Sequence, residues 1–321
     1  AIYNYNRNKL DELPNADQYL YSSYWGSSSL VPTNDYMFVE GKAIGLVRGF
    51  VSEGFYTVND FRYENGQYIL KEGIPDITKA LTATYMHPFN IPNGQTAFPG
   101  AAKFRDVNNS GTVDLDDATC LGEVMPRHTG SFQLNFNYKN FDLSSNFNWT
   151  AGGKVYNVAA MINASGQEFD GIGAQRTSWV ADTYKVYNVN SSGDLYAVTD
   201  PNELNALNAN AKYHLPYHQS GITSSEWLED GSYLRLQTLT LGYTLPHTVL
   251  NKIHIEKLRI YLTATNLFTI TGYSGIDPEV NATPTGQSGF YSNLRVFPTL
   301  NMDFGTYPRA RTFTLGANIT F

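Results

Sequence analysis

The sequence predicts an all-β protein, and its last eleven residues give the clearest evidence. In residues 311–321 the apolar side chains stand at every second position, from Phe313 to Phe321, with Thr, Gly and Asn between them. A strict period of two gives a β-strand one apolar and one polar face. The composition agrees, because charged residues make up 16% of the chain and aromatic residues 14%.

Two earlier segments show the same alternation and adjoin each other. Residues 131–139 (SFQLNFNYK) and 141–149 (FDLSSNFNW) carry aromatic residues and leucine on one face and Asn, Gln, Ser or Asp on the other. Little more than Asn140 separates them, so we expect a tight hairpin.

Four further segments complete a set of about seven predicted strands. Residues 232–245 and 258–268 alternate, and a slip of one position between Leu236 and Leu239 indicates a β-bulge. Residues 1–9 resemble the end of a strand, and residues 40–57 predict a strand interrupted by glycines.

The lengths of the connections favour an antiparallel transmembrane β-barrel. Long connections at residues 59–129, 151–229 and 269–309 alternate with short links near Asn140 and after Pro246. Membrane barrels alternate in this way between long extracellular loops and short periplasmic turns, with lipid on the apolar face and the lumen on the polar face. About seven strands are too few to close such a barrel, so we expect the chain to be part of a larger one.

Composition and motifs exclude other classes of function. The net charge of -7 argues against a nucleic-acid surface, and no catalytic motif appears, so we expect neither nucleic-acid binding nor an enzyme. The chain opens without a signal peptide, which an exported protein needs, so we expect a mature or truncated product.

The segment DVNNSGTVDLDD has the spacing of an EF-hand-type calcium loop. Calcium prefers six to eight hard oxygen ligands, which such a loop supplies at alternating positions. Asp at the last position departs from the usual Glu and has a shorter reach, and a polar turn without an ion is the alternative. The predicted ligands of this structural calcium site, which we expect in an extracellular loop, are Asp106, Asn108, Ser110, the Thr112 carbonyl, Asp114 and Asp117.

Several blocks of the sequence resemble the C-terminal barrel region of the SusC/RagA-type TonB-dependent outer-membrane transporters. The blocks are residues 40–57, 104–149, 229–246, 257–280 and 307–321, and they follow the order of that family along most of the chain. The resemblance implies the last part of a barrel of about 22 strands whose lumen is plugged. The plug domain and TonB-contacting motif that precede the barrel in this family are absent from the sequence.

The resemblance also implies a function in the bacterial outer membrane. It implies active import of oligosaccharides or peptides, driven by the TonB complex through the plug, with a SusD-like surface lipoprotein over the long loops. The alternative is a soluble, calcium-stabilised β-sandwich that binds glycans, which would show the same alternation. Aromatic residues in the connections could stack on sugars or peptides, although packing of the connections is favoured; they are Trp179, Tyr184, Tyr187, Tyr213, Tyr217 and Trp227.

Overall fold

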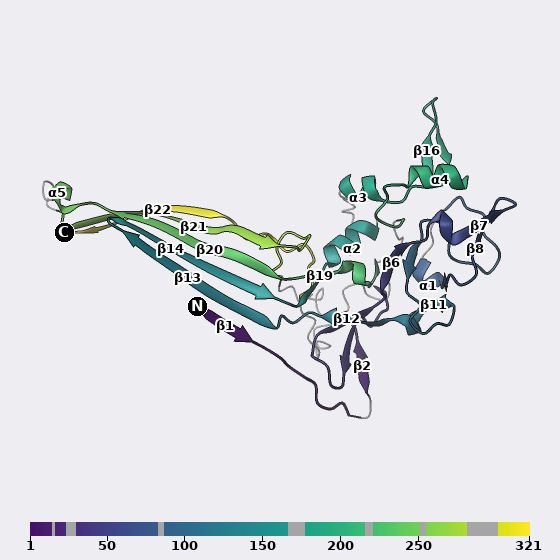
Figure 1. Ribbon diagram of the computed structural model, residues 1–321, viewed down its shortest axis with the longest axis horizontal. Helices are drawn as coiled ribbons and strands as arrows, with labels where there is room; N and C mark the ends of the chain where they lie inside the picture. Colours follow the sequence, from purple (N-terminus) through teal and green to yellow (C-terminus); the bar gives the residue numbers. More distant parts are fainter. Residues whose placement is uncertain are drawn as a thin grey trace, which may run out of the picture.

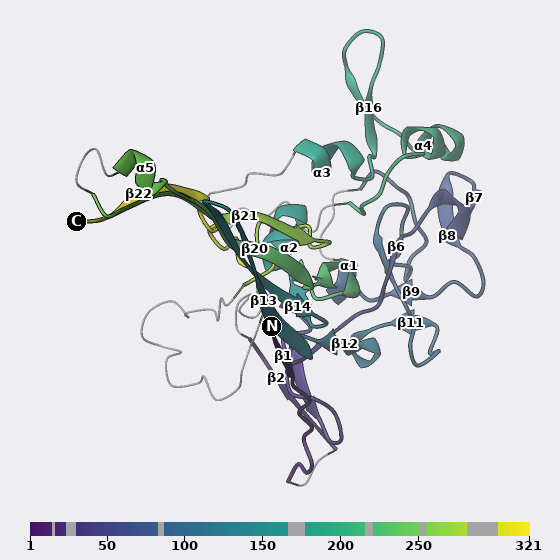
Figure 2. The ribbon, with the colours of Figure 1, turned by 60° about the vertical axis from the view of Figure 1, so that its left-hand side comes forward.

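A computed structural model of the chain describes most of its residues. The described ranges are 1–14, 17–23, 30–82, 87–165, 177–215, 221–250, 255–280 and 301–321. These residues form a long β-sheet with a folded cap at one end (Figure 1, Figure 2). The prediction of an all-β protein is confirmed, because strands dominate and the few helices are short.

Six antiparallel strands make up the long sheet. Their order is β1-β13-β14-β20-β21-β22, so strands next to each other in the sheet are also consecutive among these six along the chain. The strands are β1 (Ile2–Tyr5), β13 (His128–Tyr138), β14 (Phe141–Ala151), β20 (Tyr233–Thr244), β21 (Lys257–Thr271) and β22 (Thr312–Thr320).

The predicted hairpin and bulge are both confirmed. Strands β13 and β14 pair from His128 opposite Ala151 to Tyr138 opposite Phe141, and Lys139 in the turn has a φ of 52°. The pairing of β20 shifts register on both sides at Gln237, between Leu236 and Thr238. The extra residue keeps the leucines before and after it on the same face of the sheet.

The short connections of this sheet lie at one of its ends and the long connections at the other. Two short links, at residues 139–140 and 245–256, lie at one end with the helix α5 (His247–Leu250) (Figure 1). The three long connections, residues 6–127, 152–232 and 272–311, leave from the other end and build the cap. The first of these begins earlier than expected, because the chain enters it directly after β1.

The cap is made of short strands and helices. One sheet has the order β12-β5-β4-β2, and the remaining strands form two-stranded sheets. The four-stranded sheet contains β2 (Gln18–Tyr21), β4 (Tyr36–Val39), β5 (Leu46–Gly49) and β12 (Thr119–Glu123). The paired strands are β3 (Leu30–Val31) with β18 (Gly221–Ile222), β6 (Ser52–Phe55) with β10 (Ala102–Phe104), β7 (Phe61–Glu64) with β8 (Gln67–Leu70), β9 (Asp76–Ile77) with β11 (Thr112–Val113), β15 (Lys154–Tyr156) with β19 (Leu228–Asp230), and β16 (Tyr187–Val189) with β17 (Leu195–Ala197).

The helices of the cap are all short. The first turn of α4 is capped by the Asp200 carboxylate, which accepts from the N–H groups of Asn202 and Glu203. Within the described residues, no helix combines the length and the apolar character that crossing a membrane demands. The helices are α1 (Lys79–Thr82), α2 (Val158–Ser165), α3 (Thr177–Asp182), α4 (Pro201–Leu207), and the 3-10 turns η2 (Val58–Asp60), η3 (Leu115–Asp117) and η4 (Ser225–Trp227).

The prediction of one barrel strand over residues 40–57 is wrong. This segment lies in the cap, where it forms β5 and β6 in two different sheets. Between them Phe50 is fully buried and bridges to Ser224 of the second connection. A glycine-interrupted β pattern indicates strands, but it does not indicate the sheet to which they belong.

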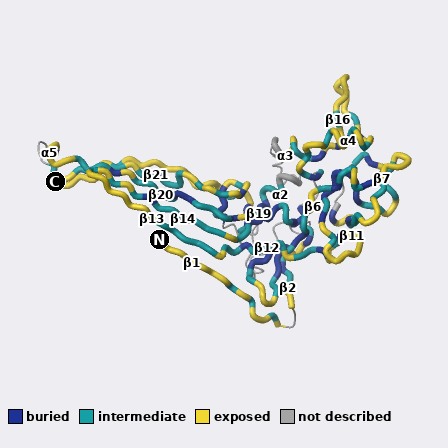
Figure 3. Tube along the Cα trace, in the orientation of Figure 1, coloured by how far each residue is buried: buried dark blue, intermediate teal, exposed yellow. Residues whose placement is uncertain are grey.

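Two large hydrophobic cores, and a small one of Val155, Tyr273 and Val280, tie the described parts of the long connections together, and the buried residues gather in the cap (Figure 3). One large core joins Phe50 and Tyr56 of the first connection to Tyr184 and Leu204 of the second. The other large core contains side chains of all three connections, among them Tyr36, Trp227 and Met302. The described residues of the long connections therefore form one packed body and not separate loops.

The buried Asp35 should make the stability of the cap depend on pH. Its side chain is fully buried, and its oxygens accept hydrogen bonds from the Ser23 N–H at 2.8 Å and the Ser23 hydroxyl at 2.5 Å. Burial outweighs these bonds and raises the pKa of Asp35 from 3.8 to about 6. The folded cap therefore holds a proton that the unfolded chain releases between these pH values, and stability falls by about 3 kcal/mol as pH rises through this window.

We expect Asp35→Asn to remove this dependence, because an amide can make both hydrogen bonds without a charge. Amide hydrogen exchange of β4 and β5, corrected for the intrinsic rate, should show opening that becomes easier from about pH 4 to 6 in the wild type only. Ser22→Ala, next to the bonded serine, is the control and should keep the wild-type slope. Equal slopes for wild type and Asp35→Asn would contradict the assignment.

Candidate functional site

The apolar face of the long sheet is continuous and exposed. Residues that alternate along each strand lie opposite one another from strand to strand, as Phe136, Leu143, Leu241, Leu262 and Leu315 do. Phe136 is 63% exposed and Leu315 76%, so no second layer of described residues covers this face. A contiguous apolar surface of this size marks contact with a membrane or a partner.

Aromatic residues border this face at both ends. Tyr3, Tyr5 and Trp149 lie at the end near the cap, and the Tyr3 ring is 6.1 Å from that of Trp149. At the other end Tyr138, Phe141 and Tyr243 are opposite one another, and the last two rings are 4.7 Å apart. Nine residues of β14 run from Phe141 to Trp149, which is within the roughly 9–11 residues that a tilted strand needs to cross a membrane.

The opposite face is lined by amide and hydroxyl groups. They supply hydrogen-bond donors and acceptors along the whole length of the strands, and some bond to each other, as Asn148 does to Gln237 at 2.6 Å. The group consists of Gln133, Asn135, Asn137, Ser144, Asn146, Asn148, Thr150, Gln237, Thr238, Thr240, Thr263, Thr265, Thr314 and Asn318.

A charged pair spans three strands of this polar face. The Arg259 Nε of β21 donates to Asp142 Oδ1 of β14 at 2.9 Å, and its Nη2 donates to Asp142 Oδ2. The intervening strand β20 carries Gly242 at this point, where a Cβ would lie 2.4 Å from Asp142 Oδ1. Only glycine leaves room for the two side chains to meet over β20.

The same cluster continues to β22. The Arg259 guanidinium lies 5.1 Å from the centre of the Tyr261 ring, a cation–π contact. The Tyr261 ring in turn covers Gly316, where a Cβ would lie 2.4 Å from the ring. An aromatic side chain laid over a strand glycine protects the backbone that the glycine exposes.

A second charged network lies where the sheet meets the cap. Arg235 is 2% exposed, and its Nη2 lies 2.5 Å from Asp277 and its Nη1 3.1 Å from Glu279. Glu279 also pairs with Arg309 at 2.8 Å. Since Asp277 and Arg309 belong to opposite parts of the third connection, the network fixes that connection to the polar face.

A second set of bonds holds the start of this connection. The Glu229 carboxylate accepts from the Ser274 N–H and hydroxyl, both at 2.7 Å, and from Asn157 Nδ2 at 2.7 Å. The Tyr273 hydroxyl donates to the buried Asp303 at 2.6 Å. A cavity of about 150 Å³ lies beside Tyr233 and Glu279, and its lining includes the glycines Gly152, Gly153 and Gly231.

None of these charged residues was predicted from the sequence. Asp142, Arg235 and Arg259 each stand on the polar side of an alternating strand. A charge at such a position is the signal that could have singled them out, because a partly buried charge needs a partner.

The structure brings part of the predicted calcium loop together. Ser110 N–H donates to Asp106 Oδ1 at 3.1 Å and to Asn108 Oδ1 at 2.8 Å, and the Ser110 hydroxyl donates to the Thr112 carbonyl at 2.8 Å. Asn109 and Gly111 have positive φ values of 59° and 87°, which close the turn.

The last two predicted ligands have other bonds. Asp117 is fully buried and accepts from the N–H groups of Val107 at 2.7 Å and Asp114 at 2.9 Å. Asp114 caps η3 by accepting from Asp116 N–H at 2.9 Å. Among the described residues, no three His, Cys, Asp or Glu side chains converge as a metal site does. Calcium binding by this loop stays a prediction.

Of the aromatic residues named above in the connections, some are packed in the cap and others are exposed. Tyr184 and Trp227 are buried in the two large cores of the cap, which agrees with packing of the connections. Tyr187 is 44% exposed on β16, and Tyr213 is partly buried. Tyr217 and the side chain of Trp179 lie outside the described residues.

Comparisons with known proteins add sequence and structural relatives. No family model matches the chain. It is 28% identical over 316 residues to TonB-dependent receptor P3 of Formosa agariphila, covering 98% of this chain and 26% of the receptor. It is 27% identical over 225 residues to the TonB-dependent receptor SusC of Bacteroides thetaiotaomicron, covering 68% of this chain and 17% of SusC.

Solved structures share the fold. The RagAB peptide importer in its open-open state matches with a TM-score of 0.58 at 18% identity, covering 99% of this chain and 26% of the solved one. The closed-closed state matches with a TM-score of 0.56 at 20% identity, with the same coverage of both chains.

These relatives belong to one class, the TonB-dependent receptors and importers. Their names are those of receptors and importers and not of enzymes. Within that class, the chain is related in sequence and fold to the SusC/RagA-type TonB-dependent transporters, and the resemblance seen in its motifs is confirmed. It spans about a quarter of the length of the first of these relatives.

The pair over Gly242 allows a sharp test. Gly242→Ala should separate Asp142 from Arg259 and lower the free energy of unfolding of the full-length protein by about 1–2 kcal/mol. Urea unfolding in detergent measures it. Gly272→Ala is the control, because a Cβ at Gly272 would meet nothing within 4 Å.

A double-mutant cycle then tests the cause. Asp142→Asn and Arg259→Gln should show a coupling energy of about 1 kcal/mol in the wild-type background and none in the Gly242→Ala background. An undiminished coupling in the Gly242→Ala background would show that the pair does not need the glycine.

Proposed function

We propose that this chain forms part of the wall of an outer-membrane β-barrel that imports nutrients in a TonB-dependent way. The observation that carries the proposal is the exposed apolar face with aromatic residues at both ends. Its polar partner face then lines the lumen, as in other membrane barrels. The relatedness to TonB-dependent receptors supports the TonB complex as the energy source of import. We propose no catalytic role.

The rest of the barrel comes from strands beyond the six described here. β1 and β22 each have one edge without a partner strand among the described residues. Unpaired backbone groups in lipid cost several kcal/mol each, so both edges require further strands of a barrel of about 22. In this proposal a plug in that barrel receives energy from the TonB complex.

The long connections face the cell exterior in this proposal. The predicted loops 59–129, 151–229 and 269–309, which correspond to the connections 6–127, 152–232 and 272–311 of the structure, are then extracellular, and the short links are periplasmic turns. A SusD-like surface lipoprotein covers the cap and delivers oligosaccharides or peptides. A peptide substrate is supported by the solved structure of a relative, the RagAB peptide importer. The hydrogen-bond donors and acceptors on the polar face suit sugars equally.

The alternative, a soluble β-sandwich that binds glycans, is not favoured. A sandwich buries the apolar face of each sheet against another sheet. Here Leu134, Phe136, Leu262 and Leu315 are all exposed, and no described element packs on them.

Site-directed spin labels test the membrane assignment. Labels placed one at a time at residues 132–138 of the full-length transporter in liposomes should alternate, with Phe132, Leu134, Phe136 and Tyr138 accessible to oxygen in lipid. The positions between them should be accessible to a water-soluble relaxation agent. Equal accessibility at odd and even positions would exclude a lipid-facing wall.

A charge on the same face should be costly. Phe136→Arg should lower the free energy of unfolding by about 2–4 kcal/mol if Phe136 lies near the bilayer midplane, and urea unfolding in liposomes measures it. Asn135→Arg, the neighbour on the polar face, is the matched control and should cost far less.

We also propose that residues 106–117 bind one calcium ion as a structural element of the cap. The residue types and spacing support it, together with the meeting of Asp106, Asn108, Ser110 and the Thr112 carbonyl in one turn. Asp114 and Asp117 complete the ligand set once their carboxylates accept the ion along with their present N–H bonds.

Removal of two ligands should abolish calcium binding. Titration calorimetry of the full-length transporter should show one site in the wild type and none after Asp106→Ala with Asp114→Ala. Loop order should fall while barrel stability stays unchanged, because the long strands do not contact the loop. Glu64→Ala with Glu72→Ala removes two exposed carboxylates elsewhere and should retain the site. Equal uptake by all three proteins would refute the proposal.

A further inference from the structure

The first strand continues its alternation beyond the edge of the apolar band. Tyr3 and Tyr5 lie on the apolar face, opposite Gly130 and His128 of β13. The chain stays paired past β1, because Asn6 N–H donates to the Arg127 carbonyl at 2.9 Å. Further along the same alternation stand Arg7 and Lys9. Two rings are thus followed by two cations at alternate positions of the chain.

The rings form a compact group. Tyr3 stacks on His128 with the ring centres 6.0 Å apart, and its hydroxyl is 2.8 Å from His128 Nδ1. The Tyr5 ring lies 5.1 Å from that of His128, and the Trp149 ring lies 6.1 Å from that of Tyr3. Despite these contacts Tyr3 is 62% exposed and Tyr5 51%, so their outer surfaces are free for a ligand.

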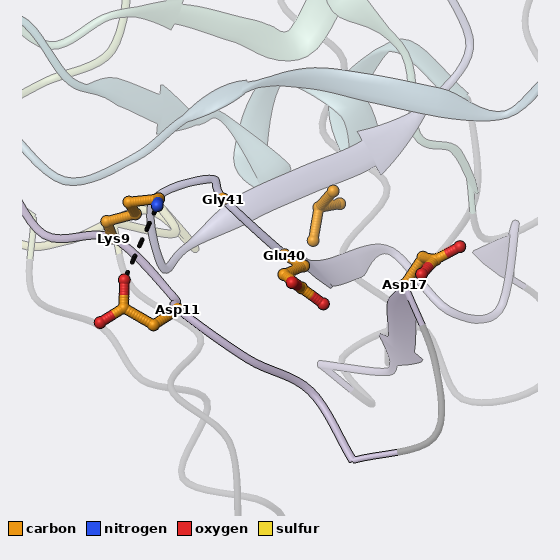
Figure 4. A pocket seen from close by; sticks show the side chains of 6 residues that line it. Lys9, Asp11, Asp17, Glu40 and Gly41 are labelled. Atoms are coloured by element: carbon orange, nitrogen blue, oxygen red, sulfur yellow. Dashed lines mark ion pairs between the residues drawn. The ribbon is translucent and has the colours of Figure 1, made fainter.

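The two cations remain accessible. The Asn8 side chain between them accepts a hydrogen bond from Ile44 N–H at 2.7 Å, which fixes this part of the chain against the cap. Arg7 is exposed, and no ion pair among the described residues involves it. Lys9 has a 61% exposed side chain whose single ion pair within the described ranges, with Asp11 at 3.7 Å, is at the surface (Figure 4).

The acidic groups nearest Lys9 are exposed to solvent, which screens their charge. Glu123 pairs with Arg127 at 2.8 Å, and the Asp11 side chain is 90% exposed. Three carboxylates, of Asp11, Asp17 and Glu40, line an open hollow of about 360 Å³ together with Lys9, and Arg7 lies outside this lining (Figure 4). An exposed ion pair such as that of Lys9 is worth little, so a phosphate can replace Asp11 as its partner.

We propose that Tyr3, Tyr5, Arg7 and Lys9, which we term the rim strip, bind the phosphate-bearing headgroup of a membrane lipid. The proposal rests on the proposed membrane-spanning function. The tyrosines contact the lipid where acyl chains give way to the headgroup, as aromatic residues at membrane interfaces do. Arg7 and Lys9 then pair with the phosphate beyond it.

The spacing suits a lipid better than a soluble anion. In an extended chain Arg7 follows Tyr5 by about 7 Å and Lys9 follows it by about 13 Å. The headgroup region extends about 5–8 Å beyond the hydrocarbon on each side of a bilayer. Arg7 therefore lies at the depth of the phosphates, and the long Lys9 side chain can reach back to them. A free phosphate would not use the two exposed tyrosines.

The test measures lipid selectivity of the full-length transporter. The protein is reconstituted in vesicles of phosphatidylcholine mixed with phosphatidylglycerol and extracted gently, and the retained lipids are counted by native mass spectrometry. The wild type should retain phosphatidylglycerol in excess. Arg7→Gln with Lys9→Gln should lower that excess roughly tenfold, since each basic residue near an anionic surface contributes severalfold. Tyr3→Ala with Tyr5→Ala should lower the retention of both lipids.

The matched control is Arg62→Gln with Lys185→Gln, which removes two exposed charges, one on β7 and one two residues before β16. Both of these strands lie in the cap, away from the long strands (Figure 1). It should leave the lipid ratio unchanged. An unchanged ratio in the rim variant, or an equal fall in the control, would overturn the proposal. A spin label at Phe136 separates the two hypotheses: a label in lipid with no selectivity refutes only the rim strip, whereas a label in water refutes the membrane wall itself.

Discussion

The register of the six long strands is the constraint on which the rest of the structure depends. Side chains alternate between faces, so a slip of one residue in any strand would move its apolar set to the polar side. At Gln237 the alternation itself slips, and the bulge corrects it, so that Leu236 and Leu239 both join the apolar face. With this register, one face is apolar from β1 to β22 and the other carries amides and hydroxyls.

Features that depend on neighbouring residues could be predicted from the sequence. The hairpin around Asn140, the bulge before Leu239 and the last strand follow from local period and turn chemistry. The cap could not be predicted, because its cores join residues far apart in the chain, such as Phe50 and Leu204. Residues 40–57 have the local pattern of a strand, yet burial of Phe50 against the second connection decides where that strand lies.

For the candidate site, too, some features could be predicted from the sequence and others could not. The calcium loop is predicted from spacing alone, since its predicted ligands lie within twelve positions, from Asp106 to Asp117. The pair of Asp142 and Arg259 cannot, because the two residues meet only through the register of three strands and the absence of a side chain at Gly242. The buried Arg235 likewise depends on a partner 42 positions away, Asp277.

The two charged networks have complementary consequences for the polar face. Asp142 and Arg259 neutralise each other far from the cap, and Arg235 and Arg309 are balanced by Asp277 and Glu279 near it. In the proposed barrel, a wall whose charges are paired presents mainly amides and hydroxyls to whatever fills the lumen. Such groups exchange hydrogen bonds with water or with a passing substrate at small net cost. Arg235 is nearly fully buried, so release of the third connection would leave its charge unpaired, which is strongly unfavourable. The mouth of the wall is thus held rigidly, while the surface below it can exchange partners.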